Sequence, residues 1–409
     1  MSIAAFPAGF TAPDRWTMRA FAVVALCFAI NMADGIDVTI LSFIAPRLQA
    51  EWGLRADTMG NLFSAGLLGM AIGGMFIAPL ADRFGRRRII MTALALMSIG
   101  MIASGFVTSV TQFFLMRVLV GSGIGTVLAA MAALASECAP EKQRNLAVGM
   151  VQAGYPFAAV FTGLFVAHLL PIHGWQVLLM SAGMITVILL PAAWFLLPER
   201  PAPADGEVYQ GGRVGALFSP VFRRRTLLLW GAVFFGLMVL YFIVSWIPKL
   251  SIEAGLTETN GIYAGALYNL GAFIGTVAMS FLAVRIPLGR LVPAMLLGAA
   301  VAMLVFGSLT MSVGMTLCVA FIIGVLLQGG YNGVWPIAAS IYPAEFRATG
   351  IGWAIGIGRS GAIIGPMLGG YLMAANVSLP VLFASYCAPL LACALCALLV
   401  QRVSGLVGR

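Results

Sequence analysis

Long apolar stretches alternate with short polar segments along the whole of this sequence. Each apolar stretch has about 20 residues or more, the length that a helix needs to cross the roughly 30 Å hydrocarbon core of a bilayer. The stretches lack the ten-residue alternation of apolar and polar positions that membrane β-barrels show. We therefore predict twelve transmembrane helices, which cover residues 18–46, 57–81, 89–108, 111–136, 145–170, 175–197, 226–250, 259–284, 290–309, 313–340, 348–374 and 379–401.

A polar segment rich in proline and glycine separates the first six spans from the last six. Such a segment is typical of a linker. We expect an N-terminal six-helix bundle at residues 1–197, a cytoplasmic linker at 198–225 and a C-terminal six-helix bundle at 226–409. The predicted fold is therefore an all-α integral membrane protein with twelve transmembrane helices in two pseudo-symmetric six-helix bundles.

A weak internal repeat supports this division. The pattern Pro-x3-Arg-x4-Gly begins at Pro140 after the fourth span and again at Pro343 after the tenth, 203 residues later. That separation is about half of the chain. Two six-span halves in parallel repeat, with a binding site near the middle of the membrane, are typical of secondary transporters.

Composition and charge agree with a membrane protein. Of the 409 residues, 61% are hydrophobic and 9% are charged, whereas a soluble domain has about 25% charged residues. The net charge of +9 does not indicate nucleic-acid binding, because the basic residues lie in short loops between the spans, as membrane topology requires. Only Arg47, Arg55 and Lys249 lie in loops on one side. Both termini are therefore expected in the cytoplasm, with the chain in the plasma membrane (the inner membrane of a bacterium).

Two aspartates interrupt the first apolar stretch, and each costs about 2.5–3.5 kcal/mol to insert at the middle of a membrane helix. Asn31, Asp34 and Asp37 are three residues apart, so they lie on one face of the helix. That face must contact other helices or a water-filled cavity rather than lipid. We predict that Asp34 and Asp37 carry protons; the alternative is a structural role in which a buried basic residue neutralises them.

Two arginines, Arg117 and Arg359, also lie inside predicted spans and balance the two aspartates in charge. Arg359 either pairs statically with an aspartate or binds an anionic ligand. We favour the ligand, because a guanidinium binds a carboxylate through two parallel hydrogen bonds.

A motif that begins at Gly69 in the second span and ends in the following loop resembles the signature of the major facilitator superfamily. Its glycine in the loop permits a tight turn. Its acid and arginines can form a charge cluster that breaks and re-forms as the two halves rock. The alternative is a loop whose arginines only set the topology. The residues of this predicted gating loop are Gly69, Asp82, Arg83, Gly85, Arg86 and Arg87.

A second motif, which begins at Arg117 and contains three glycines, resembles the signature of proton-coupled members of that superfamily. In the superfamily fold the first and fourth helices both line the central cavity. The resemblance therefore implies a pair of Arg117 with Asp34 or Asp37. The pair would serve proton coupling, or it would be a static ion pair that only compensates for burial.

Three segments together, Asp34-Gly-Ile-Asp37, the loop at 81–88 and residues 342–370, resemble the aromatic acid:proton symporters of the superfamily. That family carries benzoate-type and hydroxylated aromatic carboxylates inward with protons. The resemblance implies that Asp34 and Asp37 serve proton coupling and that Arg359 binds the substrate carboxylate.

The tenth span carries a polar and aromatic face that could stack on an aromatic ring and bind its hydroxyl groups. Aromatic stripes of this kind also arise from helix packing. The candidate substrate-binding residues on this face are Gln328, Tyr331, Asn332 and Trp335. Tyr155 in the fifth span is a further candidate.

We predict a proton-coupled transporter that imports a small organic anion, an aromatic carboxylate, by alternating access and works as a monomer in the lipid bilayer. The alternatives are an efflux antiporter and a symporter of another organic acid. A membrane-embedded enzyme would need a nucleophile–base or metal constellation inside the membrane, and the spans contain no histidine pair or cysteine–histidine set that suggests one. Neither a cofactor nor a metal is expected.

Overall fold

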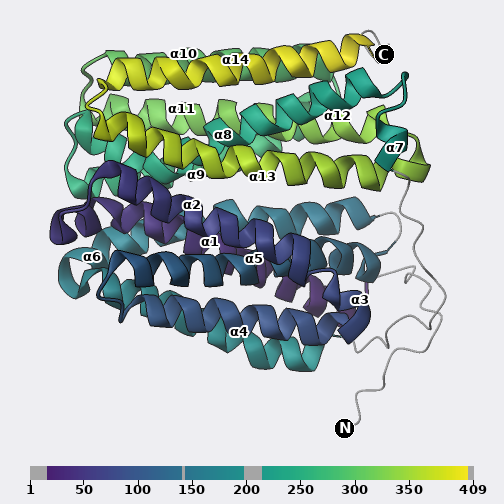
Figure 1. The fold of residues 1–409 in the computed structure, drawn as a ribbon, viewed down its shortest axis with the longest axis horizontal. Helices are drawn as coiled ribbons and strands as arrows, with labels where there is room; N and C mark the ends of the chain where they lie inside the picture. The colour runs from purple at the N-terminus through teal and green to yellow at the C-terminus, as the bar shows by residue number, and fades with distance from the viewer. Residues whose placement is uncertain (1–15, 141–142, 198–213, 404–409) are drawn as a thin grey trace. The chain divides into compact units, whose positions relative to one another are not determined.

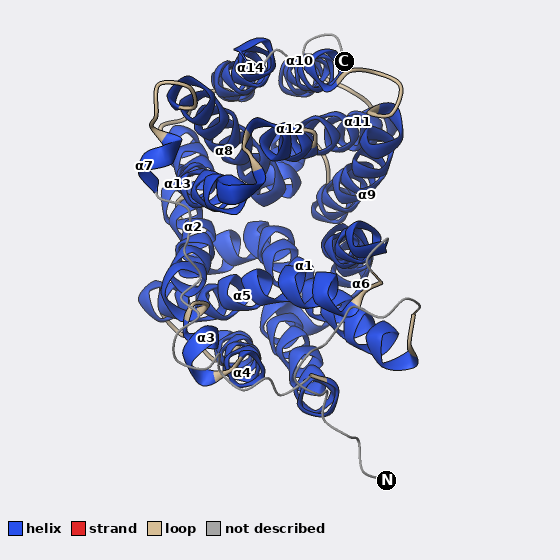
Figure 2. Ribbon diagram, turned by 90° about the vertical axis from the view of Figure 1, so that its right-hand side faces the viewer, coloured by secondary structure: helices blue, strands red, loops and turns tan. Residues whose placement is uncertain are grey.

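The computed structural model describes residues 16–140, 143–197 and 214–403, and their regular structure is helical (Figure 1). Figure 2 shows helices and loops and no strand in this described part, which confirms the predicted all-α fold. Of the predicted linker, residues 198–213 lie outside the described part. The elements are α1 (Met18–Trp52), α2 (Ala56–Ile72), the π-helical turn η1 (Gly73–Ile77), α3 (Leu80–Phe84), α4 (Arg86–Ser104), α5 (Val110–Cys138), α6 (Arg144–Leu196), α7 (Val214–Leu217), α8 (Arg223–Glu253), α9 (Glu258–Leu282), α10 (Leu288–Ser308), α11 (Val313–Asn332), α12 (Val334–Ile341), α13 (Ala344–Ala374) and α14 (Leu379–Val403).

Serine side chains cap two of the helix starts. Ser109 accepts a hydrogen bond from the backbone N–H of Gln112 at the start of α5 (3.3 Å), and Ser312 accepts one from Met315 at the start of α11 (3.4 Å). Each cap satisfies a donor that the first helical turn leaves without a partner. The two serines lie 203 residues apart, so the internal repeat extends to these helix starts.

Eleven helices of the described chain are long and apolar enough to cross a membrane. One of them, α6, has 53 residues and would be about 80 Å long as a single straight helix. Its helical backbone is interrupted at Gly174 (φ 75, ψ 171), a conformation that glycine adopts most readily. Before this point Asn31 Nδ2 of α1 donates to Val151 O (2.6 Å), and after it Gly183 packs on Ile102 of α4. α6 therefore contains two spans, and the predicted number of twelve is confirmed.

The span predicted at residues 57–81 is present but is not one regular helix. After α2 the amide of Ala78 donates to the carbonyl of Gly73, five residues back (2.8 Å), which makes a single π-helical turn. The hydroxyl of Thr126 on α5 shares its hydrogen between the Ser122 carbonyl of its own helix (2.7 Å) and the same Gly73 carbonyl (3.2 Å). α5 therefore contacts the carbonyl at which the irregular turn begins.

The span predicted at residues 313–340 is also interrupted. It is divided into α11, which ends at Asn332, and α12, which begins at Val334. Pro336 lies four residues after Asn332 and has no N–H, so the regular helical bond to the Asn332 carbonyl cannot form. The proline therefore accounts for the hydrogen bond that is missing at this break.

The described chain clusters into two compact units. Three helices, α1, α2 and α6, contribute residues to both. The predicted division into two bundles of six spans stays a prediction. The first unit comprises residues 16–40, 65–162 and 168–197, and the second comprises residues 41–64, 163–167 and 214–403.

Within the first unit, α2 and α5 cross with their backbones in contact. A Cβ atom built on Gly69 would lie 2.2 Å from the carbonyl oxygen of Val118, and one on Gly121 would lie 2.0 Å from that of Gly66. A backbone carbonyl cannot move aside as a flexible side chain can. Glycine is therefore required at these two points of the crossing.

The second unit repeats this crossing between α9 and α11. A Cβ atom built on Gly271 would lie 2.1 Å from the carbonyl oxygen of Phe321, and one on Gly324 would lie 2.0 Å from that of Tyr268. Each of these four residues lies 202 or 203 positions after its counterpart in the first unit. The repeat that the loop pattern indicated thus extends to the geometry of a helix crossing.

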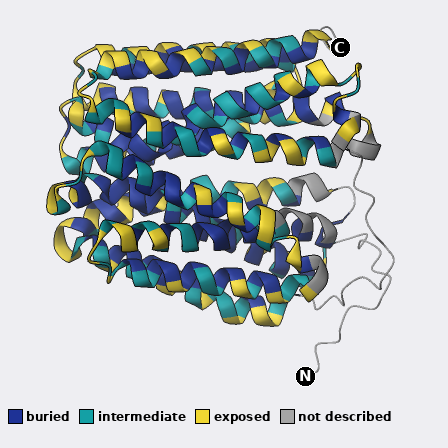
Figure 3. Ribbon diagram, viewed as in Figure 1, coloured by how far each residue is buried: buried dark blue, intermediate teal, exposed yellow. Residues whose placement is uncertain are grey.

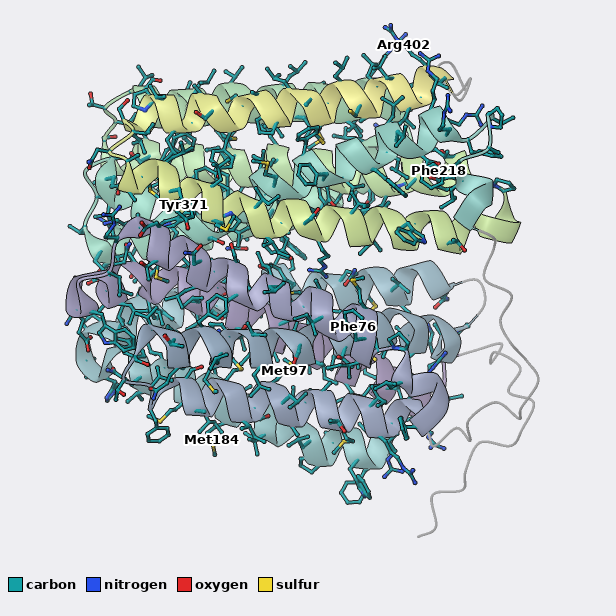
Figure 4. The ribbon with its side chains drawn as sticks, viewed as in Figure 1. Phe76, Met97, Met184, Phe218, Tyr371 and Arg402 are labelled. Atoms are coloured by element: carbon teal, nitrogen blue, oxygen red, sulfur yellow. The ribbon has the colours of Figure 1, made fainter. Side chains whose placement is uncertain are left out.

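Apolar side chains cover much of the surface of the helices. Met184 of α6 points away from the neighbouring helices (Figure 4) and is 55% exposed, while Phe106 and Phe281 are 71% and 73% exposed. Figure 3 shows helices with buried residues along one face and exposed residues along another. Exposed apolar faces of this extent are typical of helices that contact lipid.

Candidate functional site

A buried ion pair joins α1 and α5 in the first unit. Arg117 Nη1 donates to Asp37 Oδ1 at 2.7 Å, and the two side chains are 2% and 7% exposed. Removing two charges from water costs several kcal/mol per ion, which their attraction offsets only when the geometry is good. The motif implied a pair of Arg117 with either aspartate, and the structure places Arg117 against Asp37.

A third residue completes what we call the coupling triad: Asp37, Arg117 and Ser104. Ser104 Oγ, at the end of α4, accepts a hydrogen bond from Arg117 Nη2 at 3.2 Å. The guanidinium carbon also lies 5.5 Å from the centre of the Phe113 ring, within cation–π distance. Sequence reasoning missed Ser104, because a single serine near the end of an apolar helix carries no motif.

The rest of the polar face of α1 packs on α6. Asn31 bonds the carbonyl of Val151, Asp34 is buried, and a Cβ atom on Gly35 would lie 2.5 Å from the carbonyl oxygen of Tyr155. The predicted face of Asn31, Asp34 and Asp37 is therefore turned toward helices. Tyr155 borders it through its backbone, and a role of its ring in substrate binding stays a prediction.

The second unit has apolar residues where the first has the coupling triad. The register is fixed in α1 and α8 by two glycines with positive φ, Gly53 (φ 63) and Gly255 (φ 103), which are 202 residues apart. With that offset in α1 and α4 and 203 in α5, the counterparts of Asp37, Ser104 and Arg117 are Val239, Phe306 and Ala320. The helix arrangement therefore forms without these polar groups.

The second unit also has an arginine inside a predicted span, Arg359 on α13, whose side chain is half-buried. It lies within electrostatic range of Tyr331 on α11, whose side chain is 3% exposed. Tyr331 in turn packs edge-on against Trp335, with ring centres 6.0 Å apart. The structure thus brings Tyr331 and Trp335 into contact, and Arg359 lies within electrostatic range of the first of them.

The amides of the predicted face bind one another and a neighbouring helix. Asn332 Nδ2 donates to Thr276 Oγ1 on α9 (2.7 Å), and Gln328 Nε2 donates to Asn332 Oδ1 (3.4 Å). Both side chains remain half-buried. In contrast, the hydroxyls of Tyr331 and Tyr268 are buried and have no hydrogen-bond partner among the described residues.

The predicted gating loop contains a one-residue turn. Gly85 has φ 89 and ψ 139 and separates α3 from α4. This is the tight turn that the glycine of the motif led us to expect. Arg87 places its guanidinium 4.3 Å from the Trp194 ring centre on α6, and Arg86 is half-buried. The side chains of Asp82 and Arg83 lie outside the described part. Gly69, the first residue of the motif, lies at the α2–α5 crossing.

Residues 21–354 match the Major Facilitator Superfamily. The chain belongs to this superfamily. Its fold agrees: the solved D-xylose-proton symporter superimposes with a TM-score of 0.77 at 17% identity, covering 92% of this chain and 96% of that one. An inward-facing bacterial homologue of the human lysosomal transporter Spinster gives a TM-score of 0.71 at 18% identity, covering 96% and 97%.

This member of the superfamily has relatives of similar length. It is 31% identical over 403 residues to the gallate transporter of Pseudomonas putida, covering 91% of this chain and 90% of that protein. It is 31% identical over 367 residues to the 3-(3-hydroxy-phenyl)propionate transporter of Escherichia coli, covering 88% and 89%. It is 30% identical over 393 residues to the 4-hydroxybenzoate transporter of Pseudomonas aeruginosa, covering 88% and 87%.

Proposed function

We propose that this protein imports an aromatic carboxylate of the benzoate or hydroxybenzoate type together with protons, across the plasma membrane and with both termini in the cytoplasm. The observation that carries the proton part is the buried Asp37–Arg117 pair, whose counterparts in the second unit are Val239 and Ala320. A pair needed only to hold the helix arrangement together would be needed in both halves. Its presence in one half favours a role in transport.

In this proposal Asp37 gains and loses a proton during each cycle. The ionised carboxylate binds Arg117, and the protonated one releases it, so that the two states differ in a contact between α1 and α5. Asp34, one turn earlier on α1, is the second candidate carrier. Coupled proton entry offsets the cost of moving an anion against an inside-negative potential, about 2.3 kcal/mol per charge per 100 mV.

The substrate class is inferred from chemistry that the relatives' ligands share. Gallate, 4-hydroxybenzoate and 3-(3-hydroxyphenyl)propionate each have an aromatic ring, a carboxylate and at least one ring hydroxyl. Arg359 supplies a fork of donors for a carboxylate. Tyr331, within electrostatic range of Arg359, and Trp335, which packs edge-on against Tyr331, supply aromatic rings. These three residues are our candidates for the groups that bind the substrate.

The test is uptake by purified protein in proteoliposomes with an acidic exterior. We expect labelled benzoate or 4-hydroxybenzoate to accumulate above its external concentration, and D-xylose, a control without ring or carboxylate, to stay outside. Asp34→Asn and Asp37→Asn mimic the protonated state permanently. Both should abolish accumulation, while exchange of labelled for unlabelled acid survives in at least one of them.

Two results would contradict the proposal. If both aspartate variants still concentrate the acid, the aspartates are structural and proton coupling lies elsewhere. If the acid leaves the vesicles in exchange for entering protons, the protein is an efflux antiporter.

A further inference from the structure

The guanidinium of Arg117 is held at two separate nitrogens. Asp37 accepts from Nη1 (2.7 Å), and Ser104 accepts from Nη2 (3.2 Å). Ser104 is fully buried. Since the two acceptors use different nitrogens, the serine does not compete with the carboxylate for the same N–H group.

The hydroxyl of Ser104 has a fixed polarity. It donates its one hydrogen to the carbonyl of Gly100, four residues earlier in α4 (2.7 Å). Its oxygen is therefore free to act only as an acceptor toward Arg117, and a guanidinium has only donors. The contact is favourable whether Asp37 is ionised or protonated.

The contact is worth more when Asp37 is protonated. Arg117 stays charged in that state, but the carboxylate no longer neutralises it. Ser104 and the ring of Phe113 are then its neighbouring partners with partial negative charge. A hydrogen bond to a charged group contributes more when no opposite charge competes for that group. Ser104 should therefore favour the protonated form of Asp37.

We propose that Ser104 is a positioning residue, which holds the Arg117 guanidinium while Asp37 carries a proton and so sets the pH at which Asp37 exchanges it. The inference rests on the proposed proton coupling. The internal repeat supports it independently, because the counterparts of Ser104 and Arg117 are Phe306 and Ala320. The serine and the arginine are thus present in the same half and replaced together in the other.

Other titratable groups lie on the helices of the first unit that surround the triad. α4 has none between residues 89 and 104, α2 has none between 58 and 72, and α5 has only Arg117 between 110 and 136. The remaining candidates for coupling to Asp37 are Cys27 and Asp34 on α1 and Tyr155, His168 and His173 on α6. None of these is altered by a substitution in α4, so a variant of Ser104 tests the serine alone.

The experiment titrates Asp37 directly, by infrared spectroscopy of the full-length protein in liposomes. The protonated carboxyl band of Asp37 is identified as the one lost in Asp37→Asn. We expect Ser104→Ala to move the midpoint of this band toward acid by about one pH unit, which corresponds to about 1.36 kcal/mol of difference in the Ser104–Arg117 contact between the two states of Asp37. The pH dependence of uptake should move in the same direction.

The matched control is Ser98→Ala. Ser98 is also buried in α4 and donates to the carbonyl four residues earlier, that of Leu94 (2.8 Å), but it forms no bond with Arg117. The midpoint of Ser98→Ala should equal that of the wild type. Ser104→Thr keeps the hydroxyl, so its midpoint should stay close to that of the wild type. An unchanged midpoint in Ser104→Ala, or an equal shift in Ser98→Ala, overturns the inference. A shifted midpoint in a protein that transports no acid supports the role of Ser104 and rejects the proposed function instead.

Discussion

The α2–α5 crossing of the first unit and the α9–α11 crossing of the second share a backbone geometry and differ in their side chains. In the first, Gly66 on α2 lies beside Arg117 on α5. In the second, the same positions hold Tyr268 and Ala320. The large side chain is on α5 in the first crossing and on α9 in the second. Each crossing therefore pairs one large residue with one small residue. The comparison shows that both crossings share the close glycine contacts of the backbone, whereas the charged residue is present in the first crossing and absent from the second.

The largest expected effect comes from removing one member of the ion pair. Arg117→Met removes the ion-pair partner of the buried Asp37, which should lower the free energy of unfolding by about 3–5 kcal/mol. The double variant Asp37→Val/Arg117→Met has an apolar pair at these positions, as the second unit has. It should recover most of the free energy of unfolding that the single variant loses. Thermal unfolding in detergent measures both variants. Equal instability of the single and double variants would show that the charges themselves support the fold.

Arg359 should respond differently, because it is half-buried and lies in the unit without the triad. Arg359→Ala should weaken binding of 4-hydroxybenzoate by about a hundredfold, as expected for the loss of about 2.7 kcal/mol of charge-assisted hydrogen bonding. Arg359→Lys should restore part of this, since an ammonium lacks the planar fork. Binding is measured by calorimetry, and Arg402→Ala, at the exposed end of α14 (Figure 4), serves as the control. Wild-type affinity in Arg359→Ala would remove the arginine from the substrate site.

The two crossings should be equally intolerant of a single methyl group. Gly69→Ala and Gly271→Ala each place a Cβ atom against a backbone carbonyl, at 2.2 and 2.1 Å. Each should lower the free energy of unfolding by about 1–3 kcal/mol. Gly356→Ala, where a Cβ atom would meet nothing within 4 Å, should instead stabilise α13 by about 0.5–1 kcal/mol. If only one of the two crossings is damaged, the repeat does not extend to their energetics.

The smallest effect is expected at Tyr268, which takes the place of Gly66 in the second unit. Its hydroxyl is buried and has no partner among the described residues, so Tyr268→Phe removes an unsatisfied group. Thermal stability should stay the same or rise by up to about 1 kcal/mol. Tyr331→Phe, by comparison, should reduce the preference for 4-hydroxybenzoate over benzoate in a competition assay. A loss of substrate preference in Tyr268→Phe would instead place that hydroxyl at the substrate.

The sequence was sufficient for the fold because the membrane leaves few alternatives. The length of the apolar stretches and the charge of the loops predicted the spans. The irregular turn at Gly73 and the end of α11 at Asn332 were not predicted, because a hydropathy pattern does not report the local hydrogen bonding of the backbone. The candidate proton site was predicted in type and not in detail. Asp34 and Asp37 lie on the same helix face, so spacing alone could not choose the partner of Arg117.

The residues that sequence reasoning missed act through tertiary contacts. Ser104 is 13 residues from Arg117 and belongs to another helix. Gly69 was predicted as part of a gating loop, and its backbone contact with Val118 becomes visible only when α2 is placed on α5. A comparison of the two halves, residue by residue, would have drawn attention to both positions, because one changes between the halves and the other does not.

The connection at Gly174 affects how the protein is made. In most membrane proteins a polar loop follows each newly inserted span and stays in water while the next span is synthesised. Here a single non-helical residue joins two spans of α6, and a backbone without internal hydrogen bonds is costly in lipid. The two spans should therefore enter the bilayer together as a helical hairpin. A reporter inserted at residue 174 would lengthen this connection and so disturb biosynthesis, which makes it a poor place for mapping topology.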